Sequence, residues 1–171
     1  FLGADGFPVK YISIRADITK LKEVEQQALH LALYDPLTQL PNRRLLLERL
    51  DHSRATSEHS GEHCALLFID LDEFKKINDV FGHSQGDLLL RKSAQRLSRC
   101  VRQDDTVART GGDEFILILR GLDEALAPAT AVVCQVAAGI LGELGLPYQM
   151  QENDVLGEDG VLLTPSIGAV M

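Results

Sequence analysis

The sequence has no tryptophan, and only three cysteines and two methionines among its 171 residues. Cys64, Cys100 and Cys134 are odd in number and form no C-x-x-C pair, which predicts buried, unpaired thiols in a reducing compartment. A basic excess is also missing, because 25 acidic residues outnumber 17 basic ones and give a net charge of −8. The chain therefore offers no basic track for nucleic acid, and a polyanionic ligand would need a metal ion as intermediary.

Two membrane signals are missing as well. We find no apolar run of membrane-spanning length, and the first six residues lack the charged start of a signal peptide. We therefore expect a cytoplasmic domain, with any membrane anchor elsewhere in the full-length protein. Both termini lie inside predicted structure, so we expect the chain to be a piece of a longer protein.

The apolar content of 45% is that of a globular domain, and its periodicity predicts an alternation of strands and helices. A strand over 7–18 precedes a helix over 20–34, whose apolar stripe fits either a solvated connecting helix or a dimerising stalk. The remaining helices are predicted over 43–54, 74–81, 87–101 and 123–144, with loops over 53–63 and 82–86. Strands are predicted over 65–69, 107–108, 115–119 and 161–171. This β-α-β-β-α-β order predicts an α+β domain of the ferredoxin-like or polymerase-palm type, with a central antiparallel sheet covered by helices.

Carboxylates follow two of these strands. Asp70 ends a continuous apolar run, and Gly111-Gly112 forms a hairpin tip just before Asp113 and Glu114. If the two strands are neighbours, the carboxylates converge. Hard oxygen ligands of this kind suit Mg²⁺, which keeps some waters and takes further ligands from substrate phosphates.

The run Arg109-Thr-Gly-Gly-Asp-Glu-Phe115 resembles the signature of the GGDEF family, the diguanylate cyclases. Three further blocks match in order and spacing: Asp35 to Arg43, Asp70 to Asp79, and Phe81 to Asp87. The resemblance covers residues 35–171 and implies condensation of two GTP to cyclic di-GMP and pyrophosphate. It also implies an Mg²⁺ or Mn²⁺ cofactor and a homodimer joined through the 19–34 helix.

The resemblance also implies roles for individual residues. Asp113 and Glu114 resemble the catalytic carboxylates, and Asp70, the Leu71 carbonyl and Asp113 resemble the metal ligands. The residues that resemble the substrate-binding set are Asn78 and Asp87 as guanine readers, with His83, Phe74 and Lys75 around them. Arg102 and Asp105 resemble an allosteric product site for cyclic di-GMP.

The resemblance has limits at both ends of the chain. Residues 1–18 resemble the tail of a PAS sensor domain, and the family's last helix, which supplies basic side chains to the triphosphate, is not in the sequence. One alternative is a catalytically silent module that binds GTP or cyclic di-GMP and regulates an adjoining phosphodiesterase domain. Another is an ATP-using or mixed dinucleotide cyclase of the same fold, which Asp87 disfavours because adenine has no donor at N1 for a carboxylate.

Overall fold

The computed structural model describes residues 17–149 and 160–171, so the strand predicted over 7–18 lies almost wholly outside the described part. The chain divides into two compact units, residues 1–30 and residues 31–171. Helix α1 (Thr19–Leu33) contains no buried residue. The Asp17 carboxylate accepts a hydrogen bond from the Thr19 amide at 2.9 Å, and the stripe residues Leu21 and Val24 are 67% and 55% exposed. The predicted helix is therefore present, with its apolar stripe in solvent.

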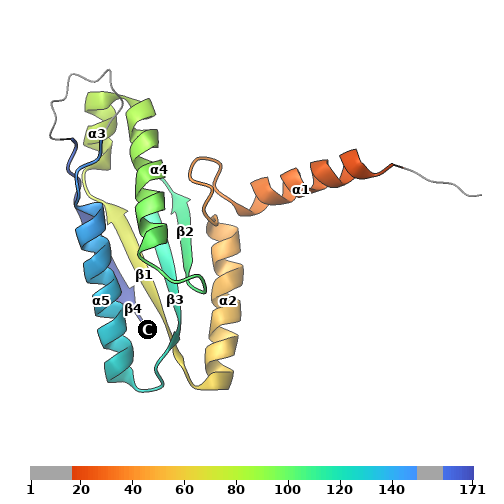
Figure 1. The fold of residues 1–171 in the computed structure, drawn as a ribbon, viewed down its shortest axis with the longest axis vertical. Helices are drawn as coiled ribbons and strands as arrows, with labels where there is room; N and C mark the ends of the chain where they lie inside the picture. The colour runs from red at the N-terminus through yellow and green to blue at the C-terminus, as the bar shows by residue number, and fades with distance from the viewer. Residues whose placement is uncertain (1–16, 150–159) are drawn as a thin grey trace, which may run out of the picture. The chain divides into compact units, whose positions relative to one another are not determined.

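The second unit alternates helices and strands as predicted (Figure 1). Its elements are α2 (Arg43–Ser60), β1 (His63–Leu71), α3 (Phe74–Phe81), α4 (His83–Arg99), β2 (Thr106–Gly111), β3 (Glu114–Leu122), α5 (Leu126–Leu144) and β4 (Pro165–Val170). The four strands form one sheet in the order β2-β3-β1-β4, and every neighbouring pair is antiparallel. The α+β, ferredoxin-like prediction is confirmed.

The sheet has two unequal faces. On one face, alternate residues of β1 such as Leu67 and Ile69 are buried in the main core with side chains of α3, α4 and α5. On the other face, Leu46 of α2 packs on Ala108 and Ile118 in a smaller cluster. Phe68 of β1 lies on this second face and remains 49% exposed. The face that carries α2 is therefore only partly covered, which leaves room beside the strand ends.

Three details differ from the prediction. Helix α2 continues through the expected polar loop to Ser60 and ends at Gly61, whose φ of 80° is left-handed. Helix α4 begins at His83, because Gly82 with φ 81° turns the chain between α3 and α4 without a loop. The thiols are not uniformly buried either, since Cys134 is exposed and Cys64 and Cys100 are half-buried.

Helix α5 bears on the membrane prediction. Among the described residues it is the one helix whose length and apolar composition would allow it to cross a bilayer, so the expected absence of such a run was wrong. Ala129, Val133, Ile140 and Leu144 of this helix are nevertheless buried in the core of the domain. A mostly buried core helix passes the same length and composition test, but only 17% of the apolar window in α5 is buried.

Candidate nucleotide and metal site

The hairpin tip has the backbone that its sequence predicts. Gly111 and Gly112 have φ values of 149° and 53°, in the range that favours glycine. A Cβ built on either glycine would meet no atom within 4 Å, so open space surrounds the tip. The two glycines therefore bring bare main chain to the surface directly before Asp113 and Glu114.

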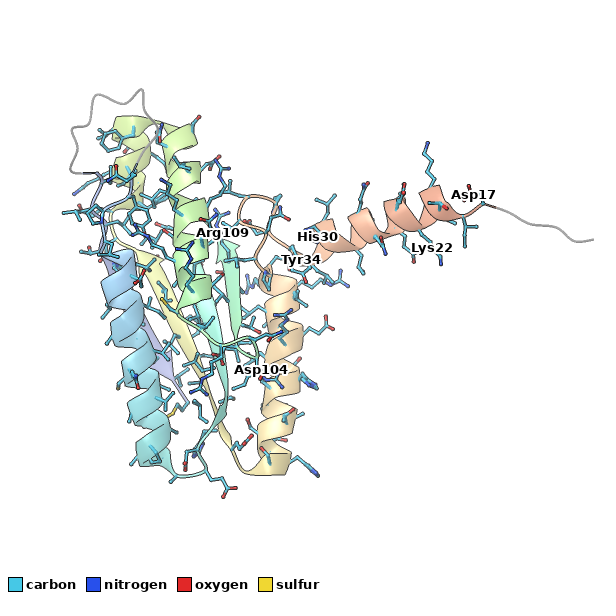
Figure 2. All side chains as sticks on the ribbon, viewed as in Figure 1. Asp17, Lys22, His30, Tyr34, Asp104 and Arg109 are labelled. Atoms are coloured by element: carbon cyan, nitrogen blue, oxygen red, sulfur yellow. The ribbon has the colours of Figure 1, made fainter. Side chains whose placement is uncertain are left out.

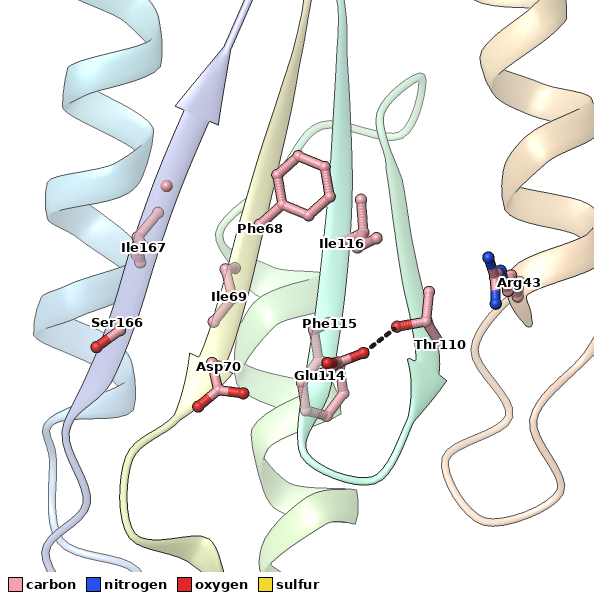
Figure 3. Close-up of a pocket in the computed structure, with 11 residues that line it drawn as sticks. Arg43, Phe68, Ile69, Asp70, Thr110, Glu114, Phe115, Ile116, Ser166 and Ile167 are labelled. Atoms are coloured by element: carbon pink, nitrogen blue, oxygen red, sulfur yellow. Dashed lines mark hydrogen bonds between the residues drawn. The ribbon is translucent and has the colours of Figure 1, made fainter.

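The two acidic strand ends meet as predicted. Asp70 of β1 is the register partner of Glu114 on β3, and Figure 3 shows both side chains side by side. Partial burial raises the pKa of the Asp70 carboxyl, and the nearby charges of Asp113, Asp72 and Glu114 raise it further. On the other side of β1, the Ser166 hydroxyl donates to Asp72 at 2.7 Å. Mutual repulsion among these carboxylates marks a place where a cation would be stabilising.

The donor set fits a magnesium ion of the kind that proteins share with a nucleotide. In residues 17–149 and 160–171, no three histidine, cysteine or acidic side chains are grouped to hold a metal by themselves. Mg²⁺ commonly takes one or two carboxylates and completes its shell with water and substrate phosphates. Asp70 and Asp113, whose charges already interact, supply such a pair.

Arg109 holds the hairpin tip in place, which the sequence alone did not reveal. Its guanidinium donates two hydrogen bonds to the Gly112 carbonyl, at 3.0 and 2.6 Å, and forms an ion pair with Asp35 at 2.9 Å. Burial raises the pKa of the Asp35 carboxyl, but hydrogen bonds from Thr38 and the Arg109 charge outweigh this and hold it below its usual range. Both residues belong to motif blocks, but the sequence did not show that Asp35 and Arg109, 74 positions apart, form a pair.

Pro41 and Asn42, in the turn that follows Asp35, link the end of α1 to Arg109. The Asn42 amide and side chain donate to the Leu33 and Ala32 carbonyls, at 2.9 and 3.0 Å. The Arg109 amide donates to the Pro41 carbonyl at 2.9 Å. A continuous set of hydrogen bonds therefore runs from the last turn of α1 to the Gly-Gly tip.

The β1–α3 connection has an unusual backbone. Glu73 has a φ of 59°, which is uncommon for a residue with a side chain and costs about 1 kcal/mol or more. It lies between the half-buried Asp72 and the first residue of α3. Strain of this kind often accompanies functional geometry, and here it lies next to the carboxylates of Asp70 and Asp72.

The predicted guanine readers lie where α3 meets α4. A Cβ on Gly86 of α4 would stand 2.0 Å from Oδ1 of Asn78 and 3.2 Å from the Phe74 ring. Only a glycine leaves room for the Asn78 side chain in this position. Asp87 is the next residue of α4, and both it and His83 are exposed. The structure thus brings Asn78 and the buried Phe74 against Gly86, the residue that directly precedes Asp87.

The two lysines at the start of α3 differ in their contacts. Lys75, the predicted phosphate ligand, is exposed. Lys76 forms an ion pair with Glu73 at the surface, and both side chains are largely exposed. The described contacts do not bring Lys75 to the carboxylates.

Arg102 and Asp105 lie before β2, at the far end of the hairpin from Gly112; Figure 2 labels Asp104 and Arg109 at opposite ends of that strand. They line a hollow of about 320 Å³ together with Arg120 and hydroxyl side chains of α2. The Asp105 carboxylate is already used, because it accepts from the Arg102 and Arg120 amides at 2.9 and 3.1 Å. The Arg102 guanidinium is exposed.

A larger pocket of about 680 Å³ opens on the partly covered face of the sheet, and we call it the strand-end pocket (Figure 3). Its polar wall comprises Arg43, Asp70, Thr110, Glu114 and Ser166. Phe68 and Ile116 contribute to an apolar floor. The Thr110 hydroxyl donates to Glu114 at 3.3 Å. Arg43, Thr110 and Ser166 had no predicted role, although Arg43 and Thr110 lie inside motif blocks.

Comparison with known proteins identifies the family. The family model "Diguanylate cyclase, GGDEF domain" matches residues 32–167, and the chain therefore belongs to this family. The chain is 40% identical over 152 residues to the bifunctional diguanylate cyclase/cyclic di-GMP phosphodiesterase MucR of Pseudomonas aeruginosa, covering 88% of the chain and 21% of that protein. It is 32% identical over 155 residues to the cyclic di-GMP phosphodiesterase PdeR of Escherichia coli, covering 90% of the chain and 22% of that protein.

The fold is also similar to that of a solved structure. The crystal structure of the coiled coil and GGDEF domain of DgcB from Caulobacter crescentus, in complex with c-di-GMP, matches with a TM-score of 0.75 and 30% identity. That match covers 89% of this chain and 75% of the DgcB chain. The chain spans about a fifth of the length of the two curated relatives named above.

Proposed function

We propose that this domain is a diguanylate cyclase, which condenses two GTP to cyclic di-GMP and two pyrophosphates. The observation that carries the proposal is the convergence of Asp70 with Asp113 and Glu114 in a place suited to a cation; partial burial and these neighbouring charges together raise the pKa of Asp70. Membership of the family and the names of its relatives support it. We place the domain in the cytoplasm, where its substrate GTP is available.

In the proposed reaction, each GTP supplies a 3′-hydroxyl that attacks the α-phosphorus of the other. A bond forms between the 3′-oxygen and that phosphorus, the bond to the β-phosphate breaks, and pyrophosphate leaves. Asp70, the Leu71 carbonyl and Asp113 would hold the metal, which when bound would neutralise phosphate charge. Glu114, which lines the strand-end pocket, would accept the proton of the 3′-hydroxyl.

Guanine selectivity would reside where α3 meets α4. Asp87 would accept from N1–H and N2 of guanine, and Asn78 would donate to its acceptors. Asp87→Ala should weaken GTP binding by about 1.5–3 kcal/mol, the worth of a charge-assisted hydrogen bond, with little effect on ATP. Equal losses for both nucleotides would indicate a structural role.

Gly86→Ala tests whether GTP binding depends on the space that Gly86 leaves for the Asn78 side chain. Alanine usually stabilises a helix interior by about 0.5–1 kcal/mol relative to glycine, but here its Cβ would displace Asn78. We expect weaker GTP binding, while the gain in helix propensity is offset by the crowding of the buried Phe74 ring, 3.2 Å from the new Cβ. Gly139→Ala on α5, where a Cβ would meet no atom within 4 Å, is the matched control.

The proposed reaction needs two domains face to face. The exposed stripe of α1 is the proposed contact, and the coiled coil named in the DgcB structure supports it. The specific rate should rise with protein concentration as dimers form. A specific rate independent of concentration in a demonstrably monomeric sample would disprove the dimer requirement.

Cyclic di-GMP is the proposed feedback ligand of the hollow that contains Arg102 and Asp105. The exposed Arg102 guanidinium could bind a guanine edge or a phosphate with its planar fork. Its place at the far end of the hairpin from Asp113 supports inhibition without occupation of the reaction site.

The decisive experiment incubates a chain extended beyond Met171 with GTP and Mg²⁺ and identifies the products by mass. We expect cyclic di-GMP and pyrophosphate from GTP and no dinucleotide from ATP. The alternative is a silent module that binds nucleotide and regulates a phosphodiesterase domain, which the likeness to PdeR favours. Tight GTP binding without turnover in the extended chain would support that alternative.

A further inference from the structure

Arg43 stands apart from the other residues of the strand-end pocket. Of the described residues that line this pocket, it alone carries a positive charge. Figure 3 shows it at the start of α2, on the far side of Thr110 from Asp70 and Glu114. The pocket therefore has an anionic wall on β1 and β3 and a cationic wall on α2.

Arg43 has no evident role in stabilising the described part of the fold. Arg43 and Arg44 open helix α2, where the helix dipole disfavours positive charge, and the first turn has no acidic residue. The helix is capped by Asn42, whose side chain accepts from the Arg44 and Leu45 amides. Within the described part of the chain, the Arg43 guanidinium has no hydrogen-bond or ion-pair partner, whereas Arg109 is fully engaged. A cation kept free in this position is available to a ligand.

The composition of the pocket indicates which ligand. Its volume of about 680 Å³ has room for the ribose and phosphates of a nucleotide whose guanine lies at Asn78 and Asp87, and Phe68 and Ile116 offer apolar area to the ribose. The carboxylates would face a metal, and the planar fork of Arg43 matches a phosphate. We propose that Arg43 binds a phosphate of a nucleoside triphosphate held in the strand-end pocket. This inference rests on the proposed function and adds to it a phosphate ligand from α2.

Adjacent arginines provide the test. Calorimetric titration with Mg²⁺ and a GTP analogue that carries a methylene bridge between its α- and β-phosphates measures binding without turnover. For Arg43→Ala we expect about 10- to 100-fold weaker binding, the range for loss of a charge-assisted contact, and for Arg43→Lys a smaller loss. Arg44→Ala, which removes a neighbouring exposed arginine that does not line the pocket, should stay within about twofold of the parent.

Guanosine, which has no phosphate, separates a phosphate contact from a change in pocket shape. Its affinity should be the same for the parent and for Arg43→Ala. Equal binding of the analogue by Arg43→Ala and Arg44→Ala would overturn the role of Arg43 and leave the cyclase proposal intact. A parallel loss of guanosine binding would also overturn it, and a parent that binds no analogue would overturn both. If a thermal melt shows that Arg43→Ala does not fold, Arg43→Gln takes its place, with the same expected loss and the same contradicting results.

Discussion

Asp70 and Asp105 are both acidic residues at the ends of the sheet, but they differ in what surrounds them. Asp105 accepts two backbone hydrogen bonds, from Arg102 and Arg120, and so helps to close the loop before β2. Asp70 faces Asp113 and Glu114, and these neighbours make its charge less favourable. A carboxylate satisfied inside the protein stabilises the fold, whereas a cluster of repelling carboxylates is kept for something that binds.

Removing a carboxylate from the repelling end should have the largest effect on activity. We expect Asp113→Ala to abolish cyclic di-GMP formation, because the metal would lose a ligand, while the free energy of unfolding changes by no more than about 0.5 kcal/mol. The measurements are product formation and a denaturant melt. Glu48→Ala, which removes an exposed carboxylate from α2, is the control. Turnover near the parental rate would show that Asp113 is not needed.

Loosening the hairpin tip should have the second largest effect on activity. Arg109→Ala removes the hydrogen bonds to Gly112 and leaves Asp35 half-buried without its ion pair, so we expect a loss of about 1–3 kcal/mol in stability and a severalfold lower rate. Denaturant unfolding of Arg109→Ala, Asp35→Ala and the double variant measures the coupling between the two side chains. Additive effects would contradict a direct coupling between Asp35 and the tip.

The raised pKa of Asp70 predicts a pH dependence of stability. The folded state holds this proton more tightly than the unfolded state, so between the ordinary value of 3.8 and the raised folded pKa the stability falls as the pH rises. Above that window the repulsion is fully present, and Mg²⁺ should relieve it. Melting temperatures of the parent and of Asp70→Asn, taken from acid to neutral pH, check this. Asp70→Asn should lose both the pH dependence of stability that comes from Asp70 and the stabilisation by Mg²⁺. If the melting temperature of Asp70→Asn varied with pH as it does in the parent, Asp70 would not be the group responsible.

The smallest effect on catalysis is expected at the satisfied end. Arg102→Ala should leave the initial rate nearly unchanged, relieve inhibition by cyclic di-GMP and remove one class of its binding in calorimetry. Asp105→Ala should instead destabilise the fold by about 1–3 kcal/mol, because two backbone amides lose their acceptor. Arg91→Ala, an exposed arginine of α4, is the control. Unaltered inhibition in Arg102→Ala would reduce Arg102 to a surface residue.

Much of the fold could be predicted from the sequence, because apolar runs and glycines act locally. The order of elements and the Gly-Gly tip were predicted, and α3 was found within its predicted limits. The convergence of Asp70 with Glu114 followed from the assumption that their strands are neighbours, and the register confirms it. The helical continuation to Ser60 was missed, because polar residues on a solvent-facing helix resemble a loop.

Long-range pairings were beyond such reasoning. Nothing local to Asp35 or Arg109 indicates that their side chains meet, and nothing near Gly86 shows that its missing Cβ makes space for Asn78. The strand-end pocket combines residues of α2, β1, β2, β3 and β4, so its composition becomes apparent only in three dimensions. Interactions between distant segments depend on packing, which periodicity does not encode.

The place of β4 in the sheet has a consequence for synthesis of the protein. Asp70 pairs with Ser166, and the hydroxyl of that serine reaches Asp72 from 94 positions further along the chain. Contacts so distant in sequence form late, because a long loop must close first. While the ribosome is still making α5, β1 lacks its β4 neighbour and the pocket lacks one wall. A nascent chain should therefore remain unable to bind nucleotide in this pocket until β4 has emerged and docked.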